Sequence, residues 1–389
     1  MGRIWIGLAS LAIGFAAGLW AGRLTISDVQ PTFAFLNEWA SPVATLPIGA
    51  HAPDFVLPGV DGREHRLADF ADARALAVIF TCNHCPTAQA YEERLIALTH
   101  EYAARGVAFV AISPNDPDAL RPDELGYTDV SDGLADMKLR AEEKNFPFPY
   151  LYDGDDQSAS RAYGPVATPH LFLFDAERRL RYAGRIDDAD DPRKARAHDA
   201  RNALESLLAG RPIQKETTRP FGCSIKWAEK EASAEQAQAE WESQPVELTP
   251  MTIEAAGALA KNDTDRWLLL NLWASWCAPC VTELPELAAM SRNYAHRGLD
   301  VATLSVDDPE RQEHAIAALE RLHIPLRNYV FDGTDRDALA GVIDPMWPGS
   351  LPHTVLIAPG GSIAYRVAGA FDPLDLRRAI LQRLGRTYF

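Results

Sequence analysis

Apolar positions along the chain form short continuous runs separated by polar, turn-rich stretches. Residues 76–80 and 107–112 are such runs and contain β-branched members, which is typical of strands buried on both faces. Between them, residues 88–105 favour a helix that ends at Gly106. We therefore predict a β-α-β unit with parallel strands and a right-handed crossover.

The remainder of this half is less regular. Residues 114–145 are polar and rich in turn formers, with one helix expected at 134–144, so they read as an insertion rather than core. Residues 171–174 and 179–183 then predict a β-hairpin, and a helix is expected over 198–208.

The second half repeats this order of elements. The expected strands and final helix are, in order, 267–273, 301–306, 354–357, 363–367 and 373–384. Two copies of strand, helix, strand, hairpin and helix indicate an internal duplication. The predicted fold class is α/β, with two domains that each hold a central mixed β-sheet flanked by helices.

The first residues predict export. Residues 4–21 are apolar, with Arg3 before them and Arg23 after them, so residues 1–23 fit a signal peptide or a membrane anchor. Leu19 makes a poor cleavage site before Ala21 and favours an uncleaved anchor. We expect a periplasmic or otherwise extracytoplasmic protein held at the inner membrane by residues 4–21.

Changes of composition set the expected boundaries. The stretch from 228 to 246 is rich in Ala, Glu and Gln and carries little apolar face, which is typical of a linker. The predicted segments are a leader or anchor at 1–23, a linker at 24–46, a first domain at 47–227, a linker at 228–246 and a second domain at 247–389.

Composition narrows the classes of partner. Of the 389 residues, 47% are hydrophobic and 24% are charged, as in ordinary globular proteins. A net charge of −16 repels phosphate backbones, and no basic stripe is present in the sequence. No nucleic-acid partner is expected.

Four of the five cysteines form two C-x-x-C pairs, Cys82 with Cys85 and Cys277 with Cys280. A disulfide within such a pair closes a very short ring and contributes little to stability. Redox chemistry is therefore the better explanation for these pairs. The fifth, Cys223, is interpreted as a buried structural thiol in preference to a resolving cysteine.

Each pair follows a predicted strand and precedes a predicted helix. The free N–H groups at a helix start stabilise a thiolate, so we expect Cys82 and Cys277 to attack substrates and Cys85 and Cys280 to resolve the mixed disulfides. Structural zinc would need further Cys or His ligands at suitable spacing, so no metal site is predicted here.

Residues 273–280, Trp-Ala-Ser-Trp-Cys-Ala-Pro-Cys, resemble the active site of the thioredoxin superfamily. The resemblance implies thioredoxin-like folds, with a cis-proline loop beside each dithiol that binds an extended substrate peptide. The matching dipeptides are Thr168-Pro169 and Leu351-Pro352.

The second half resembles the exported TlpA/ResA branch through Cys280-Val-Thr-Glu283-Leu-Pro285, and Asn271 stands where classical thioredoxins carry a buried acid. The resemblance implies disulfide reduction in cytochrome c maturation or copper-site assembly. It also implies that Glu283 handles protons for the resolving thiol; the alternative is a solvated first-turn glutamate.

The first half resembles the redoxin, or AhpC/TSA-like, branch. The residues that carry this likeness are 81–86 (Thr-Cys-Asn-His-Cys-Pro), 150–153, 162–164 and 184–188. Peroxidase activity is not expected, because peroxiredoxins place Thr three residues before the reactive cysteine. Here Cys82 precedes Cys85 and Ile79 precedes Cys82 at that distance.

Neighbouring residues are expected to tune the two centres. A protonated His84 stabilises a thiolate and makes the first centre the more oxidising. Trp276 and Pro279 flank Cys277 without charge, so the second centre is expected to be the stronger reductant. The expected partners are protein disulfide or dithiol substrates and a membrane electron donor, with no cofactor besides the cysteine pairs.

Two alternatives stay open for the first half. Cys82 and Cys85, with His84 or His170, are soft ligands for Cu(I), although redoxin-like copper chaperones separate their cysteines by three residues rather than two. The other alternative is a redox-inactive interaction module. For His353, which follows Pro352, we expect a strand residue with a hydrogen-bonded ring.

Overall fold

Two mixed β-sheets organise the part of the chain that the computed structural model describes, residues 43–389. The apolar run at 4–21 and nearly all of the first predicted linker lie outside the described residues. Within the described range, no helix combines the length and apolar character that a membrane crossing requires.

The first sheet has the strand order β5-β4-β3-β6-β7. Its central strand β3 pairs in parallel with β4, which pairs in parallel with β5, and antiparallel with β6, which continues into β7. The strands are β3 (Ala75–Phe80), β4 (Val107–Ser113), β5 (Tyr150–Tyr152), β6 (His170–Phe174) and β7 (Leu180–Gly184). The predicted parallel unit and hairpin are confirmed.

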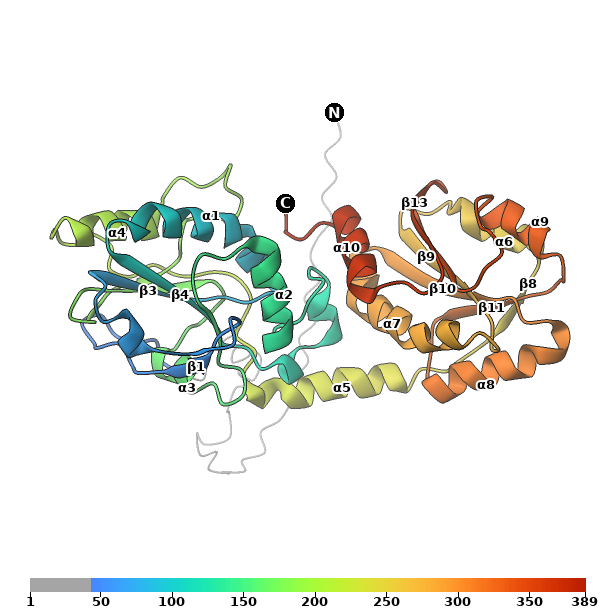
Figure 1. Cartoon of the computed structure of the whole chain (residues 1–389), viewed down its shortest axis with the longest axis horizontal. Helices are drawn as coiled ribbons and strands as arrows, with labels where there is room; N and C mark the ends of the chain where they lie inside the picture. Colours follow the sequence, from blue (N-terminus) through green and yellow to red (C-terminus); the bar gives the residue numbers. More distant parts are fainter. Residues whose placement is uncertain (1–42) are drawn as a thin grey trace, which may run out of the picture. The chain divides into compact units, whose positions relative to one another are not determined.

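The continuous apolar sequence of β3 follows from burial on both faces. Ala75, Ala77 and Ile79 belong to a core shared with two helices, α1 (Pro86–Ala103) and α4 (Asp199–Leu208). The alternate residues Leu76, Val78 and Phe80 belong to a second core on the other face. Figure 1 shows α1 and α4 together on one face of this sheet.

The opposite face is covered by shorter elements. These are β1 (Val56–Pro58), its antiparallel partner β2 (Glu64–Arg66) and α3 (Ser158–Tyr163). The helix α2 (Leu134–Lys144) has the predicted bounds.

The second sheet, with the order β13-β12-β9-β10-β11-β8, repeats the first and adds β8 in parallel to β11. Its strands are β8 (Thr249–Met251), β9 (Trp267–Trp273), β10 (Leu299–Ser305), β11 (Arg327–Phe331), β12 (His353–Ile357) and β13 (Ile363–Ala368). As in the first sheet, the central strand pairs in parallel on one side and antiparallel on the other. The predicted duplication and the α/β fold class are confirmed.

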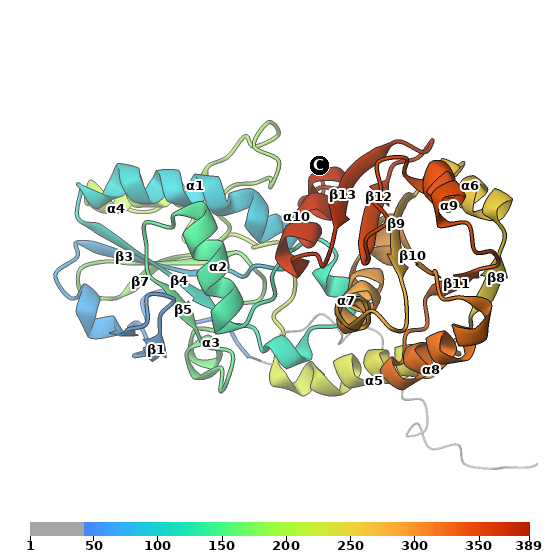
Figure 2. The ribbon, with the colours of Figure 1, turned by 45° about the vertical axis from the view of Figure 1, so that its right-hand side comes forward.

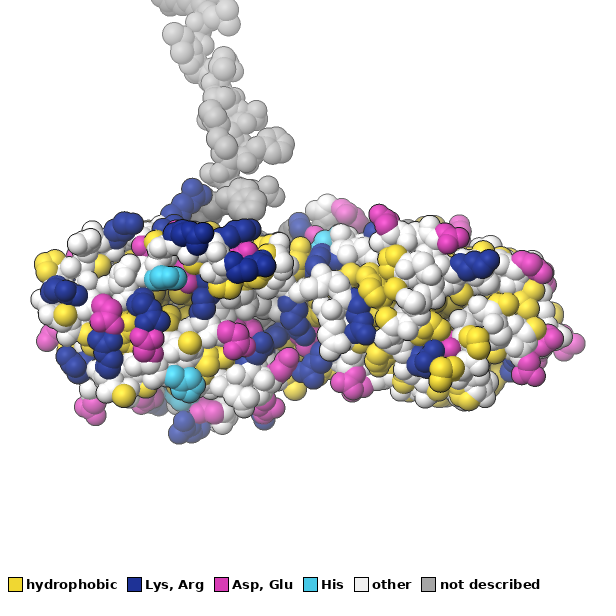
Figure 3. All heavy atoms as spheres, turned by 90° about the horizontal axis from the view of Figure 1, so that it is seen from above, with side chains coloured by type: hydrophobic (Ala, Val, Ile, Leu, Met, Phe, Trp, Pro, Cys, Tyr) yellow, Lys and Arg dark blue, Asp and Glu magenta, His cyan; other side chains and the backbone are white. Residues whose placement is uncertain are grey.

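Helices flank this sheet as well (Figure 2). They are α6 (Ile253–Lys261), α7 (Ala278–Tyr294), α8 (Gln312–Leu322), α9 (Arg336–Ile343) and α10 (Pro373–Leu384). The expected linker at 228–246 contains a further helix, α5 (Glu231–Glu242). On the face shown in Figure 3, basic and acidic side chains are interspersed.

Candidate functional site

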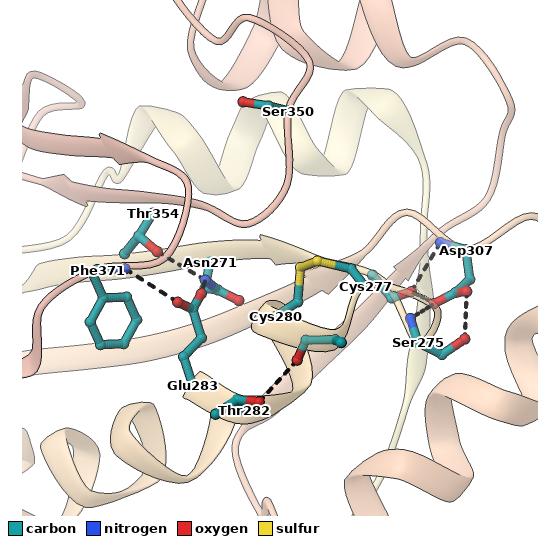
Figure 4. Close-up of a disulfide and its surroundings, with 12 residues drawn as sticks. Asn271, Ser275, Cys277, Cys280, Thr282, Glu283, Asp307, Ser350, Thr354 and Phe371 are labelled. Atoms are coloured by element: carbon teal, nitrogen blue, oxygen red, sulfur yellow. Dashed lines mark hydrogen bonds between the residues drawn. A yellow bond between two sulfur atoms is a disulfide. The ribbon is translucent and has the colours of Figure 1, made fainter.

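The second C-x-x-C pair lies between β9 and α7 and forms a disulfide, Cys277–Cys280. Cys277 is the N-cap residue of α7, and Pro279 occupies the first turn, where proline is favoured. Both cysteines are buried, whereas the neighbouring Trp276 is 48% exposed and marks the approach to the pair. Figure 4 shows this disulfide and its surroundings.

Glu283 lies one helical turn after Cys280 and is buried. Its Oε1 accepts a hydrogen bond from Asn271 Nδ2 at 2.7 Å, and its Oε2 accepts one from the Phe371 N–H at 3.4 Å (Figure 4). Burial raises the pKa of Glu283 to about 7, although both hydrogen bonds act to lower it. A carboxyl group with this pKa exchanges protons near neutral pH.

Asp307 holds the turn before Cys277. Its Oδ2 accepts from the Ser275 N–H at 2.7 Å, and its Oδ1 accepts from Ser275 Oγ at 2.8 Å (Figure 4). Asp307 was not predicted from the sequence, because it stands two positions after the end of β10 and carries no motif of its own.

The first C-x-x-C pair consists of two free thiols, with Cys82 3% and Cys85 0% exposed. Here the second cysteine caps the helix: Cys85 is the N-cap residue of α1, and Pro86 follows at the first helical position. The Cys85 sulfur accepts hydrogen bonds from the Ala88 N–H at 3.4 Å and the Cys223 N–H at 3.3 Å.

The two thiols of this centre differ in their tendency to ionise. Burial raises the pKa of Cys82 well above its ordinary value. Burial also acts against Cys85, but hydrogen bonds from Cys223 and Cys82 and the charge of His84 outweigh it and lower the Cys85 pKa. The geometry therefore stabilises the negative charge on Cys85, whereas the sequence analysis expects Cys82 to attack.

A buried carboxylate, Asp132, organises the residues between the two cysteines. Its Oδ1 accepts from the backbone N–H groups of Asn83 at 2.8 Å and His84 at 3.0 Å. Its Oδ2 lies 2.6 Å from His84 Nδ1 and accepts from Asn115 Nδ2 at 2.7 Å. Burial opposes protonation of His84, but the charge and hydrogen bond of Asp132 outweigh it and raise the His84 pKa.

Asp132 and Asn115 come from the segment 114–145, which the sequence analysis interprets as an insertion outside the core. Both are completely buried, so that interpretation is wrong for these residues. A polar, turn-rich sequence is typical of surface loops, and no local signal shows that Asp132 would fold onto a dipeptide 48 positions away.

One compact group of donor atoms lies near Cys82. Among the described residues, Cys82, His84 and Asp132 form a compact group with ligand atoms within 4.8 Å of one another, and this group leaves out Cys85. A carboxylate is a hard ligand and suits Cu(I) poorly. Both Asp132 oxygens already accept hydrogen bonds.

The histidines after the two prolines have other partners. His170 is buried, and its Nδ1 accepts from the Val166 N–H at 3.3 Å. His353 lies on β12 with Nε2 3.0 Å from Asp344 Oδ2, which confirms the expected hydrogen-bonded strand residue.

Thr168-Pro169 and Leu351-Pro352 both have cis peptide bonds, as the resemblance implies. Thr168 contacts both thiols of the first centre: its Oγ1 lies 3.2 Å from the Cys82 sulfur, and its carbonyl oxygen accepts from the Cys85 thiol at 3.2 Å. The first loop therefore lies directly against its dithiol.

Comparison with known proteins finds a family match in each half of the chain. The AhpC/TSA family profile matches residues 48–183 and again residues 251–366. The chain is 27% identical over 111 residues to the thiol-disulfide oxidoreductase ResA of Geobacillus kaustophilus, covering 28% of this chain and 59% of ResA. It is 35% identical over 106 residues to the thiol:disulfide interchange protein DsbE of Escherichia coli K12, covering 27% of this chain and 51% of DsbE. The chain thus spans little more than half the length of these curated relatives.

Among solved structures, an uncharacterised conserved protein from Geobacillus kaustophilus is 38% identical. The match covers 46% of this chain and 92% of that one, with a TM-score of 0.42.

Proposed function

Because this chain belongs to the AhpC/TSA family, whose profile matches more than half of it, we propose that it exchanges thiols and disulfides with protein substrates at two centres. One observation carries the proposal: in each half, a C-x-x-C pair lies between the central strand and a helix that begins at one of its cysteines. The likeness to ResA and DsbE supports the same chemistry.

At the second centre, the reduced pair acts as a disulfide reductase. The Cys277 thiolate attacks one sulfur of a substrate disulfide and releases the other substrate sulfur. The Cys280 thiolate then attacks Cys277, which releases the reduced substrate and forms the Cys277–Cys280 disulfide. Glu283 accepts the Cys280 proton, for which its raised pKa and its position after Cys280 suit it. Substrate peptide pairs with the backbone at Leu351-Pro352.

At the first centre, Cys82 and Cys85 perform the same thiol–disulfide exchange, and His84 tunes this pair. The positive charge of His84 lowers the pKa of Cys85 and so favours the reduced form. We therefore assign the more oxidising potential to this centre.

We place the protein outside the cytoplasm, anchored by residues 4–21, with reductase roles in cytochrome c maturation or metal-site assembly. The apolar run and its flanking arginines support the location. A membrane electron donor would return the pairs to the dithiol state.

Trapping of mixed disulfides tests the proposal. Cys280→Ser should accumulate a covalent complex with substrate protein through Cys277, and Cys277→Ser should not. Cys82→Ser and Cys85→Ser are compared in the same way at the first centre. Absence of thiol-sensitive complexes in all four variants, with intact folding by circular dichroism, would rule out exchange.

A further inference from the structure

Cys223 lies on a segment that pairs with the Thr168-Pro169 loop. Thr168 and Cys223 form an antiparallel bridge, and the Thr168 N–H donates to the Cys223 carbonyl oxygen at 3.0 Å. Gly222 has φ of +142°, and a Cβ at this position would lie 1.9 Å from the Thr168 oxygen. Only glycine permits so close an approach, so the pairing is built into the sequence.

The same pairing brings a third sulfur to the dithiol. The Cys223 N–H donates to the Cys85 sulfur at 3.3 Å, and the Cys223 side chain packs on the small cluster of Cys82, Cys85 and Ala88. Cys85 therefore has a cysteine neighbour on each of two segments, and both of these neighbours lower its pKa.

Exposure distinguishes the three thiols. Cys82 and Cys85 are almost completely buried, whereas Cys223 is partly exposed. The segment around Cys223 occupies the backbone positions that an extended substrate would use at this loop. A substrate disulfide thus meets Cys223 before it meets the buried pair.

We propose that Cys223 is a third redox thiol, presented by residues 221–225 as an internal substrate that carries disulfides between the buried Cys82–Cys85 pair and outside partners. This inference rests on the proposed exchange function of the first centre.

The step conserves atoms and electrons. The Cys223 thiolate attacks the Cys85 sulfur of a Cys82–Cys85 disulfide, the bond between Cys82 and Cys85 breaks, and a Cys85–Cys223 disulfide forms. Cys82 leaves as a thiolate and takes up the proton that Cys223 released. The step is an exchange between one thiolate and one disulfide, so it consumes no external oxidant.

The neighbouring charges are compatible with this attack. Hydrogen bonding to the Cys85 thiolate, burial and the negative charge of Cys85 all raise the pKa of Cys223. The first and third causes vanish once Cys85 is in a disulfide. Burial and the negative charge of Glu124, which raise the Cys223 pKa, remain, as does the positive charge of Lys226, which lowers it.

The test uses the full chain carrying Cys277→Ser and Cys280→Ser, so that only three cysteines remain. In this background Cys82→Ser should form a Cys85–Cys223 disulfide under mild oxidation, as mapped by mass spectrometry of unreduced peptides. Cys85→Ser should form at least about tenfold less Cys82–Cys223 disulfide, because exchange requires contact between the sulfurs. Equal amounts in both variants, or persistently free thiols in Cys82→Ser, would overturn the relay.

A second variant tests the geometry without removing a thiol. Gly222→Ala should displace the segment from Thr168 and lower the yield of Cys85–Cys223 disulfide at least about tenfold, while Gly210→Ala, also at positive φ but in open space, should not. If Gly222→Ala keeps the full yield, or if added Cu(I) protects all three thiols and no disulfide forms, the relay is wrong.

The two proposals fail separately. If the chain with all three of these cysteines forms Cys82–Cys85 disulfide and exchanges it with substrate, but Cys85–Cys223 never forms, only the relay is excluded. If Cys82–Cys85 disulfide is never detected, the exchange function of the first centre fails as well.

Discussion

In the first centre the second cysteine caps the helix, whereas in the second centre the first cysteine does. Proline explains the difference: Pro86 follows the first pair, while Pro279 lies inside the second, and proline is favoured in the first turn of a helix. Relative to the helix start, the two C-x-x-C pairs are therefore shifted by three residues. The helix therefore stabilises a different thiolate in each centre.

The surroundings differ as well. His84 and Asp132 form a buried charged pair between the first two cysteines. At the second centre the carboxyl group after the resolving cysteine, Glu283, instead accepts a hydrogen bond from the uncharged Asn271. Two centres with one motif therefore control protons in different ways, one with an ion pair and the other with one titrating acid.

The largest expected effect comes from removing the stabilised thiolate of each centre. With the other centre inactivated by serine and Cys223→Ser in the background, Cys277→Ser and Cys85→Ser should each lower the rate of reaction with a small aromatic disulfide at least about 10³-fold. Cys280→Ser and Cys82→Ser should retain the first, mixed-disulfide step, which stopped-flow absorbance measures. If Cys82 rather than Cys85 proves to be the reactive thiol, the helix start does not decide which cysteine attacks.

The next largest effect is expected at Asp132. Asp132→Asn leaves His84 buried without its carboxylate and should lower the free energy of unfolding by about 3–5 kcal/mol. The control Asp307→Asn removes an acceptor that has hydrogen-bonded but no charged side-chain partners, and should cost about 1–3 kcal/mol.

The effect of Asp132→Asn should depend on pH with a predictable sign. The Asp132 pKa is lowered from 3.8 in the folded chain, chiefly by His84 against the opposing effect of burial, so its contribution is lost as pH falls below 3.8. The His84 pKa is raised from 6.5, so its contribution is complete below 6.5 and lost as pH rises through the raised value. Urea unfolding should therefore show the largest difference between wild type and variant from about pH 4 to 6.5. A difference that does not vary with pH would contradict the ion pair.

Glu283 tests how the second centre transfers protons. Glu283→Gln should slow the resolving step of the second centre about 10²-fold at pH 8 and leave the first centre unchanged. In wild type this step should accelerate as pH rises through about 7, the pKa of Glu283, because the carboxylate is the form that accepts a proton.

The free energy of unfolding of wild type should fall over the same rise in pH that accelerates the resolving step. The folded pKa of about 7 lies above the ordinary value of 4.5, so wild type loses stability as pH rises from 4.5 to 7. Glu283→Gln should remove this loss and be about 2–3 kcal/mol more stable at pH 8. Glu286→Gln, on the same helix in a partly exposed ion pair with Arg377, is the matched control and should change neither property.

Local sequence was sufficient for the elements that carry strong apolar periodicity or clear ends. β9, α2 and α10 have the predicted bounds, because an unbroken apolar run or a capping residue marks them. Short strands such as β5 and β11 were not predicted, since three to five residues at the side of a sheet leave little pattern.

The site was predictable where chemistry is concentrated in a motif. Each C-x-x-C pair lies between a strand and a helix, as expected, and Thr168-Pro169 and Leu351-Pro352 are both cis. A contact with the dithiol is recorded for the first of these loops. The contact of Asp132 with His84 and the contact of Cys223 with Cys85 were not predicted. The partners are 48 and 138 positions apart, respectively, and only folding brings them together. Proline position relative to each pair was present in the sequence and could have shown which cysteine caps the helix.

At neutral pH the smallest effect is expected at the histidines that follow the two prolines. Burial lowers the pKa of His170 to about 3, while burial also lowers that of His353 against the opposing charge of Asp344. Both imidazoles are therefore neutral at pH 7. Since the unfolded His170 takes up a proton below 6.5 and the folded one does not, wild type should lose up to about 1.4 kcal/mol per pH unit as pH falls from 6.5 towards 3. His170→Phe should remove this acid sensitivity and leave exchange at the first centre unchanged; a His170 NMR resonance that titrates near pH 6.5, or lost exchange, would instead make His170 part of the redox site.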